Sequence, residues 1–318
     1  MLYGQDPAYV SLRRAGLVLE TRLTDSPPVQ PRRRFTIVLP GGRTLELGGR
    51  TLVMGIINVT PDSFSDGGVL FDATRAIEAG VQMAAEGADL LDVGGESTRP
   101  GAQPLDESEE HRRVLPVIEG LARRVDVAIS VDTYKASIAR SALEAGASVV
   151  NDISGLRYEP DLAAVVARYR AAIILMHTRG RSQEMYKEAV YTEVVDEVLD
   201  ELRTSMAFAM DAGVPRDSVL IDPGLGFAKE AAHNYEVLGR LEEFSDLGRP
   251  LVAGPSRKRF LTRPLDAELP APERDWPTAA AVAAAVLAGA HVVRVHAVRE
   301  MAAVVRVADE IRKYHRQH

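Results

Sequence analysis

The chain has 318 residues, of which 46% are hydrophobic and 26% charged, and this balance excludes a disordered or collagen-like protein. Its 45 acidic and 38 basic residues give a formal net charge of −7, which disfavours a general nucleic-acid or anionic-membrane surface. The absence of cysteine excludes disulfides, thiolate catalysis and Cys-ligated metal sites, so any chemistry must use carboxylates, amides, histidines, cations or a bound metal.

The N-terminal part of the chain is the least regular. Residues 1–34 end in DSPPVQPRRR and predict an irregular arm, whose three arginines we interpret as solvated surface rather than a nucleic-acid patch. The N-terminus has no signal-peptide pattern, and the longest strongly apolar run, 279–290, is too short to span a bilayer. We therefore expect a cytoplasmic protein with no nucleic-acid or membrane partner.

The rest of the chain alternates apolar runs with helix-like segments. Two β-type runs around Pro40-Gly41-Gly42 first predict a β-hairpin over 35–49. Eight apolar runs follow, at 52–57, 89–94, 127–131, 148–150, 171–176, 218–221, 250–254 and 291–295. Such alternation predicts an α/β fold with a parallel sheet, and eight units favour a (β/α)₈ TIM barrel over 51–316; an open doubly wound sheet is the alternative. We therefore expect a single domain at 35–318 behind the arm.

Polar residues stand at or just after the ends of these runs. They are Asn58, Asp92, Asp132, Asn151, Asp152, His177, Asp222, Ser256, Lys258, Arg294 and His296. In a barrel the C-terminal ends of the strands build the active site, so these groups are expected to converge. Taken singly, an Asp after a strand more often caps a helix, and His177 is more often a hydrogen-bonded core histidine. Taken together, several partly buried acids need partners.

The predicted mouth of the barrel divides into two chemical sets. An acceptor-rich set suits a flat heterocycle that displays N–H groups; its members are Asp132, Asn151 and Asp222. A cationic set suits phosphate oxygens; its members are Arg99, Lys258, Arg294 and His296. We expect a ligand with an amino-heterocycle at one end and phosphate at the other.

Seven motifs together resemble the dihydropteroate synthase family. They are MGIINVTPDSFSDGG (54–68), DVGGESTRPGA (92–102), SVDTYK (130–135), NDISG (151–155), DPGLGF (222–227), SRK (256–258) and RVH (294–296). Their order and spacing match the family over about residues 51–310. The resemblance implies that 6-hydroxymethyl-7,8-dihydropterin pyrophosphate condenses with p-aminobenzoate, with Mg²⁺ as cofactor, to give 7,8-dihydropteroate and pyrophosphate. It also implies a target of sulfonamides.

The resemblance assigns roles to individual residues. The pterin-binding positions fall on Asp132, Asn151, Asp222 and Lys258, with Ser256 and Arg259 nearby, and the phosphate-binding pair falls on Arg294 and His296. Asn58 falls where the family binds Mg²⁺ with the pyrophosphate. Two loops would close over the reacting centre and supply Phe64, Asp66, Thr98, Arg99 and Pro100. Phe64, Pro100 and Phe227 would wall the p-aminobenzoate slot.

The family's dissociative displacement needs no covalent nucleophile. Mg²⁺, Arg294 and His296 would stabilise the departing pyrophosphate, and Asp132 and Asp66 a pterin carbocation. The catalytic set that the resemblance implies is Asp66, Arg99, Asp132 and Lys258.

Three residues depart from the family pattern. Arg259 replaces a common Ser, and we expect it to bind the p-aminobenzoate carboxylate, with a solvent-facing side chain as the alternative. Ala297 replaces a usual Asp and predicts a loop held less tightly. Pro255 restricts the seventh loop.

Two other functions use similar scaffolds. A methyltetrahydrofolate–corrinoid methyltransferase would share the pterin floor but not the loops at 60–68 and 97–104, and a pterin carrier would not need Asn58, Arg294 and His296 together. The resemblance also implies a homodimer, in which the alanine-rich helix at 278–289 packs against a partner; burial against its own barrel is the alternative.

Overall fold

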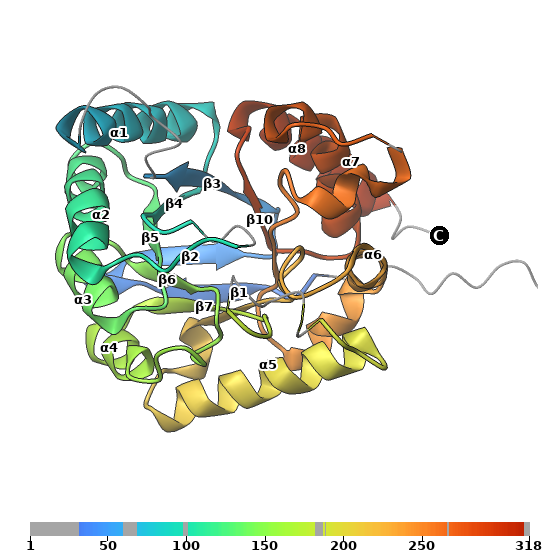
Figure 1. Ribbon diagram of the computed structural model, residues 1–318, viewed down its shortest axis with the longest axis horizontal. Helices are drawn as coiled ribbons and strands as arrows, with labels where there is room; N and C mark the ends of the chain where they lie inside the picture. Colours follow the sequence, from blue (N-terminus) through green and yellow to red (C-terminus); the bar gives the residue numbers. More distant parts are fainter. Residues whose placement is uncertain are drawn as a thin grey trace, which may run out of the picture.

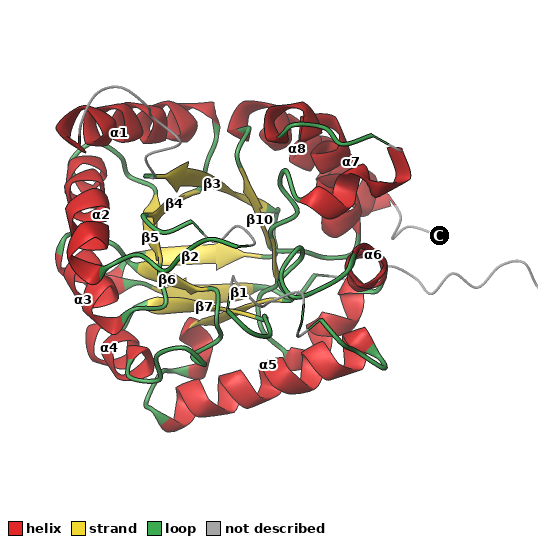
Figure 2. Cartoon of the chain, viewed as in Figure 1, coloured by secondary structure: helices red, strands yellow, loops and turns green. Residues whose placement is uncertain are grey.

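Eight strands of the computed structural model form one parallel sheet (Figure 2). The structure describes residues 32–59, 69–97, 101–181, 187, 189–265 and 267–314, and for 69–72 it describes the backbone alone. The strands are β3 (Leu52–Asn58), β4 (Leu90–Gly94), β5 (Ala128–Asp132), β6 (Val149–Asp152), β7 (Ala172–Met176), β8 (Val219–Asp222), β9 (Val252–Ala253) and β10 (Val292–Val295). Their order is β8-β7-β6-β5-β4-β3-β10-β9, and a parallel bridge between Ile221 and Leu251 joins the two ends. The predicted TIM barrel is thus confirmed.

A ring of α-helices surrounds the strands (Figure 1). The helices are α1 (Val69–Glu86), α2 (Glu107–Ala122), α3 (Ala136–Glu144), α4 (Leu162–Tyr169), α5 (Val194–Asp211), α6 (Ala231–Gly239), α7 (Asp275–Leu287) and α8 (Val298–Tyr314). Short 3₁₀ segments lie at Pro40–Gly42, Arg216–Ser218, Leu241–Leu247, Arg259–Leu265 and Ala271–Arg274. Within the part of the chain that the structure describes, no helix has both the length and the apolar character needed to cross a bilayer.

Helix α2 illustrates how the sequence specifies these outer helices. Asp106 caps its N-terminus by accepting a hydrogen bond from the backbone N–H of Ser108 at 2.8 Å. Glutamates in its first turn complement the positive end of the helix dipole. Its buried residues Val114, Val117, Ile118 and Leu121 recur at helical spacing, so one face of the helix packs into the layer between helices and barrel.

Alternate residues of each strand face the barrel interior, and the chemistry of this inner face changes along the strands. The lower layer is apolar and includes Met54, Leu90, Val149, Leu220 and Val292. Two residues further along the same strands stand Ile56, Asp92, Asn151, Asp222 and Arg294. Because the side-chain period of a strand is two, these residues point to the same inner face. The barrel therefore has an apolar floor and a mostly polar mouth.

The N-terminal hairpin closes the floor of the barrel. Its strands β1 (Phe35–Val38) and β2 (Thr44–Leu47) pair antiparallel, which confirms the predicted hairpin. Ile37, Leu45 and Leu47 are buried in one cluster with the lower-layer residues of the barrel, and Figure 1 shows both strands within the ring of helices. This packing leaves the opposite, C-terminal end of the strands for a site.

The predicted arm lies largely outside the described residues, which begin at Arg32. The Arg32 side chain is buried and pairs with Asp309 on α8 at 2.9 Å. Residue 32 is thus held against the body of the barrel, and the division between an arm at 1–34 and a domain at 35–318 stays a prediction.

Candidate active site at the barrel mouth

An arginine crosses the mouth and gathers the acids around it. Arg294 of β10 donates from Nε to Asp92 Oδ2 and from Nη2 to Asp132 Oδ2, each at 2.6 Å. Asn151 Nδ2 donates to the same Asp92 oxygen at 3.0 Å. The expectation that the buried acids need partners is met by Arg294, which pairs with two of them, because burial in the mouth requires each charge to have a partner.

Asp92 lies in the mouth, where the sequence placed it without assigning it a role. It is fully buried, and its Oδ1 has no hydrogen-bond partner among the described residues. Leaving a buried carboxylate oxygen unpaired costs free energy, so this atom is suited to accept a hydrogen bond from a ligand. The strand period explains why it faces inward, because Asp92 follows the inward-facing Leu90 by two residues.

Burial shifts the titration of the mouth residues toward neutral pH. It raises the pKa of Asp132 to about 7, against the opposing charge of Arg294. It raises the pKa of Asp222 to about 6, although the Gly224 N–H that Asp222 accepts at 2.7 Å opposes the change. Burial lowers the pKa of Lys258 to about 7, and the charge of Arg294 adds to this shift. Perturbed groups gathered at one end of a barrel are typical of a functional site.

Lys258 and Phe227 form one wall of the mouth. Lys258 Nζ lies 3.7 Å from the centroid of the Phe227 ring, a close cation–π contact. The turn that carries Phe227 approaches so closely that a Cβ at Gly226 would stand 2.7 Å from Lys258 Cδ. Glycine at position 226 therefore lets the aromatic ring and the lysine share one wall, and the role of Phe227 in a p-aminobenzoate slot stays a prediction.

Ser256 orients the imidazole of His296. Ser256 Oγ accepts the backbone N–H of His296 at 3.1 Å and lies 2.9 Å from His296 Nδ1. The hydroxyl therefore binds both the backbone and the ring of His296, and so orients the imidazole. Burial lowers the pKa of His296 to about 3, with Arg257 contributing. His296 thus offers the mouth a neutral imidazole rather than a positive charge.

The turn between Pro255 and Lys258 is held in an unusual backbone conformation. Lys258 N donates to Pro255 O at 3.2 Å, and Arg257 has a φ of 57°, which is uncommon for a residue with a side chain. Two hydrogen bonds of 2.7 and 2.8 Å to Asp275 hold the Arg257 side chain, and its backbone N donates to Thr278 Oγ1 at 2.9 Å. These contacts place Lys258 at the mouth.

A second polar chain lies outside the barrel wall, between β7 and α5. His177 is buried, and its Nε2 lies 3.1 Å from Glu201 Oε2 while its Nδ1 lies 2.9 Å from Lys229 Nζ. Burial lowers the pKa of His177 to about 3, with the charge of Lys229 contributing. The interpretation of His177 as a hydrogen-bonded core histidine is confirmed. Lys229 and Glu201, which the sequence did not single out, are its partners.

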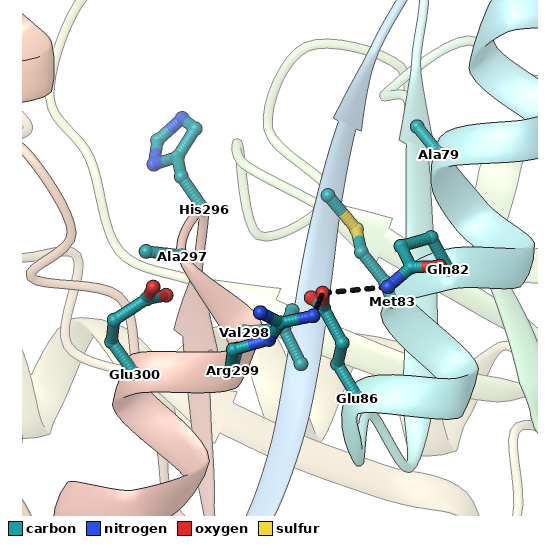
Figure 3. A pocket seen from close by; sticks show the side chains of 9 residues that line it. All are labelled: Ala79, Gln82, Met83, Glu86, His296, Ala297, Val298, Arg299 and Glu300. Carbon is teal, nitrogen blue, oxygen red and sulfur yellow. Dashed lines mark hydrogen bonds and ion pairs between the residues drawn. The ribbon is translucent and has the colours of Figure 1, made fainter.

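A pocket of about 310 Å³ lies beside His296, between α1 and the first turn of α8 (Figure 3). Glu86 and Arg299 form an ion pair of 2.9 Å that connects the two helices across it. Ala297 begins α8, since its carbonyl accepts the N–H of Met301 at 3.0 Å. The departure at position 297 therefore leaves the start of α8 without the side-chain cap that an aspartate would supply.

Some predicted site residues cannot be placed. Phe64, Asp66, Thr98, Arg99 and Pro100 lie outside the described residues, so their roles stay predictions. Arg259 pairs with Glu268 at 2.6 Å and its side chain is 74% exposed, so contact with a substrate carboxylate also stays a prediction.

Asn58 is the predicted metal ligand. It ends β3 and stands in register with Gly94, which in turn stands beside Asp132. Among the described residues no group of three His, Asp or Glu is arranged to hold a metal ion. A single amide oxygen nevertheless fits Mg²⁺, which usually keeps several waters and takes its other ligands from substrate phosphates.

Comparisons with known proteins point to one family. The family model described as "pterin binding enzyme" matches residues 54–296. The dihydropteroate synthase of Synechocystis is 45% identical over 278 residues, which are 87% of this chain and 96% of that protein. Two solved dihydropteroate synthases have the same fold. The Yersinia pestis enzyme in a sulfonamide complex has a TM-score of 0.81 at 38% identity, over 88% of this chain and 100% of that one. The Xanthomonas albilineans enzyme with 4-aminobenzoic acid has a TM-score of 0.80 at 41% identity, over 87% and 98%.

Proposed function

The chain belongs to the pterin-binding enzymes and, among them, to the dihydropteroate synthases, and we propose that its barrel mouth joins p-aminobenzoate to 6-hydroxymethyl-7,8-dihydropterin pyrophosphate. The main support for this function is that the acid cluster around Arg294 and the wall formed by Lys258 and Phe227 lie at the same mouth. The products are 7,8-dihydropteroate and pyrophosphate.

The acid cluster would bind the pterin. Asp222 and Asp132 are acceptors for N–H groups, and Asp92 Oδ1 offers one more acceptor. Asn151 is oriented by its bond to Asp92, so its amide oxygen is free to accept. Lys258 Nζ, which lies against the Phe227 ring, supplies a hydrogen-bond donor. A heterocycle with several N–H groups and a carbonyl matches this set of acceptors and donors.

The reaction itself is a displacement at the pterin methylene carbon. The bond from this carbon to the pyrophosphate oxygen breaks, the aryl amine nitrogen forms the new C–N bond, and the amine loses a proton. Arg294 Nη1 and the His296 imidazole are donors for the leaving oxygens, and Asp132 stabilises positive charge on the pterin, with Asp66 proposed beside it. Arg99 would contribute a further positive charge from its loop.

Asn58 would hold Mg²⁺ together with the pyrophosphate oxygens. When it is bound, this ion neutralises charge on the leaving group. Phe227 provides the described wall of the aryl-amine slot; Phe64 and Pro100 are its proposed companions, and Arg259 its proposed carboxylate contact. A sulfonamide, which carries a similar aryl amine, would compete for the same slot.

We further propose a homodimer formed through α7 and α8. The two helices pack side by side and leave large apolar side chains exposed, with Trp276 86% and Val307 61% accessible. Exposed apolar groups of this kind favour a protein partner. Light scattering at micromolar concentration should give twice the chain mass, and a monomer mass would contradict the proposal. A cytoplasmic location stays a prediction of the sequence.

A pyrophosphate-release assay tests the function. Release should require dihydropterin pyrophosphate, p-aminobenzoate and Mg²⁺ together. A pterin carrier would bind the pterin without turnover, and a corrinoid methyltransferase would be indifferent to the aryl amine. Release without p-aminobenzoate, or none with all three components, would contradict the proposed function.

A further inference from the structure

The turn after β8 presents two substrate-facing residues, and a buried lysine holds it from behind. Asp222 begins the turn, Phe227 lies near its end, and Lys229 follows. Lys229 is 1% exposed, and its Nζ donates to the carbonyls of Gly224 and Phe227, each at 3.2 Å. One side-chain nitrogen therefore ties together the two halves of the turn.

A hydrogen-bonded chain orients this lysine. Glu201 on α5 accepts from His177 Nε2, which leaves Nδ1 with the lone pair that receives Lys229 Nζ at 2.9 Å. Arg179 donates to Glu201 from Nε at 2.9 Å and so keeps the carboxylate in place. The Nζ of Lys229 thus lies within hydrogen-bonding distance of three acceptors: the imidazole and two carbonyls.

The turn is closely packed, and an apolar side chain at position 229 could not replace the hydrogen bonds of this anchor. A Cβ at Gly224 would stand 1.9 Å from the carbonyl oxygen of His177, and Gly224 has a φ of +71°. The turn is thus pressed directly against the end of β7. An apolar residue at position 229 would fill the volume but would leave the Phe227 carbonyl without its donor, and such a loss in a buried site allows the backbone to shift.

We propose that Lys229 is a positioning residue for the condensation, acting through the turn to hold Asp222 against the pterin and Phe227 against the aryl amine. Lys229 reaches neither substrate, since it lies behind the turn and its Nζ bonds are directed to the backbone and to His177. The inference rests on the proposed function, because it concerns the same mouth.

The test compares Lys229→Met with Arg249→Met in steady-state assays. Methionine keeps the length of the lysine and removes its donors. Arg249 is a matched control: it is equally hidden, at 5% exposure, and it donates to the carbonyl of Val219 at 3.1 Å, at the other end of the same strand. Lys229→Met should raise the KM for both substrates about tenfold while kcat changes by less than about threefold. Arg249→Met should lower Tm and leave both KM values within about twofold.

A second pair of variants covers the case in which Lys229→Met does not fold. His177→Gln keeps one acceptor and one donor on a planar group, whereas His177→Leu keeps neither. We expect His177→Gln to retain KM values within about threefold of the wild type, and His177→Leu to raise them as Lys229→Met does.

The outcomes separate the two proposals. Unchanged KM values in Lys229→Met, an equal rise in Arg249→Met, or identical behaviour of the two His177 variants would each overturn the positioning role while wild-type turnover stands. Absence of any condensation by the wild-type chain would instead overturn the proposed function.

Discussion

Replacing Asp92 by asparagine tests whether the acid cluster around Arg294 is part of the working site. The carboxylate receives Arg294 Nε at 2.6 Å and Asn151 Nδ2 at 3.0 Å on one oxygen, and its other oxygen is buried without a partner among the described residues. Asparagine has nearly the same shape, so the substitution removes charge and one acceptor but no volume. Arg294 then keeps Asp132 as its remaining counter-charge.

The size of the effect follows from these contacts. A hydrogen bond to a charged group contributes about 1.5–3 kcal/mol and a neutral one about 0.5–1.5 kcal/mol, so the hold on Arg294 weakens by about 1 kcal/mol. Loss of the acceptor at Oδ1 removes a further bond of about 1 kcal/mol from the bound pterin. Together these make about 2 kcal/mol, which is about a thirtyfold loss of kcat/KM.

The assay is steady-state pyrophosphate release, with Asp152→Asn as the control. Asp152 is also fully buried, but its oxygens accept from Ser154 and Leu156 within its own turn. Asp152→Asn should cost stability and leave kcat/KM within about threefold. A kcat/KM for Asp92→Asn within threefold of the wild type, or an equal fall in both variants, would refute the role of Asp92.

Three further predictions follow from the same geometry. Asp132→Asn and Lys258→Ala should each lower kcat/KM at least about a hundredfold in the same assay, the scale of losing one preorganised charge; activity within threefold of the wild type would reject the residue concerned. Burial lowers the pKa of Lys229 to about 7 in the folded protein. Between about pH 7 and 10.5 the unfolded chain therefore binds more protons than the folded protein, and the free energy of unfolding increases as pH rises. Urea unfolding from pH 7.5 to 9.5 should therefore show the wild type gaining about 2–3 kcal/mol relative to Lys229→Met, and parallel curves would exclude a depressed pKa. Ala297→Asp should cap α8 and stabilise the protein by about 1 kcal/mol in the same unfolding experiment, whereas a loss of stability would show that position 297 does not act as the cap.

The barrel was predictable because its signal is repeated and local. Each buried strand is a short apolar run bounded by a polar loop, as Leu90–Gly94 and Ala172–Met176 show, and eight repetitions leave few other architectures. The hairpin was equally local, since Pro40 and two glycines mark its turn. What the runs could not show is that the hairpin closes the barrel floor, because that contact joins Ile37 to strands far along the chain.

The candidate site was predictable only in part, for a physical reason. Residue types and motifs indicated Asp132, Asn151, Asp222 and Lys258, but partners depend on distances across the barrel that no local pattern contains. Arg294 was assigned to phosphate, and the buried acids were expected to need partners, but only the structure shows that Arg294 pairs with two of these carboxylates, Asp92 and Asp132.

The residues behind the mouth were harder to find than those in it. Lys229 follows a familiar motif and looks like a surface lysine in the sequence, yet it is one of the most deeply buried side chains of the described protein. Its partner His177 follows β7, and Glu201, which contacts His177, lies on α5. The hydrogen-bonded network of these three residues therefore exists only in the folded state.

The most direct test of the proposed function follows the new C–N bond. The purified chain is incubated with dihydropterin pyrophosphate, Mg²⁺ and ¹⁵N-labelled p-aminobenzoate, and the products are quantified by mass spectrometry. We predict ¹⁵N-labelled 7,8-dihydropteroate and pyrophosphate in equal amounts. Pyrophosphate without labelled dihydropteroate, or no product from a folded chain, would contradict the account.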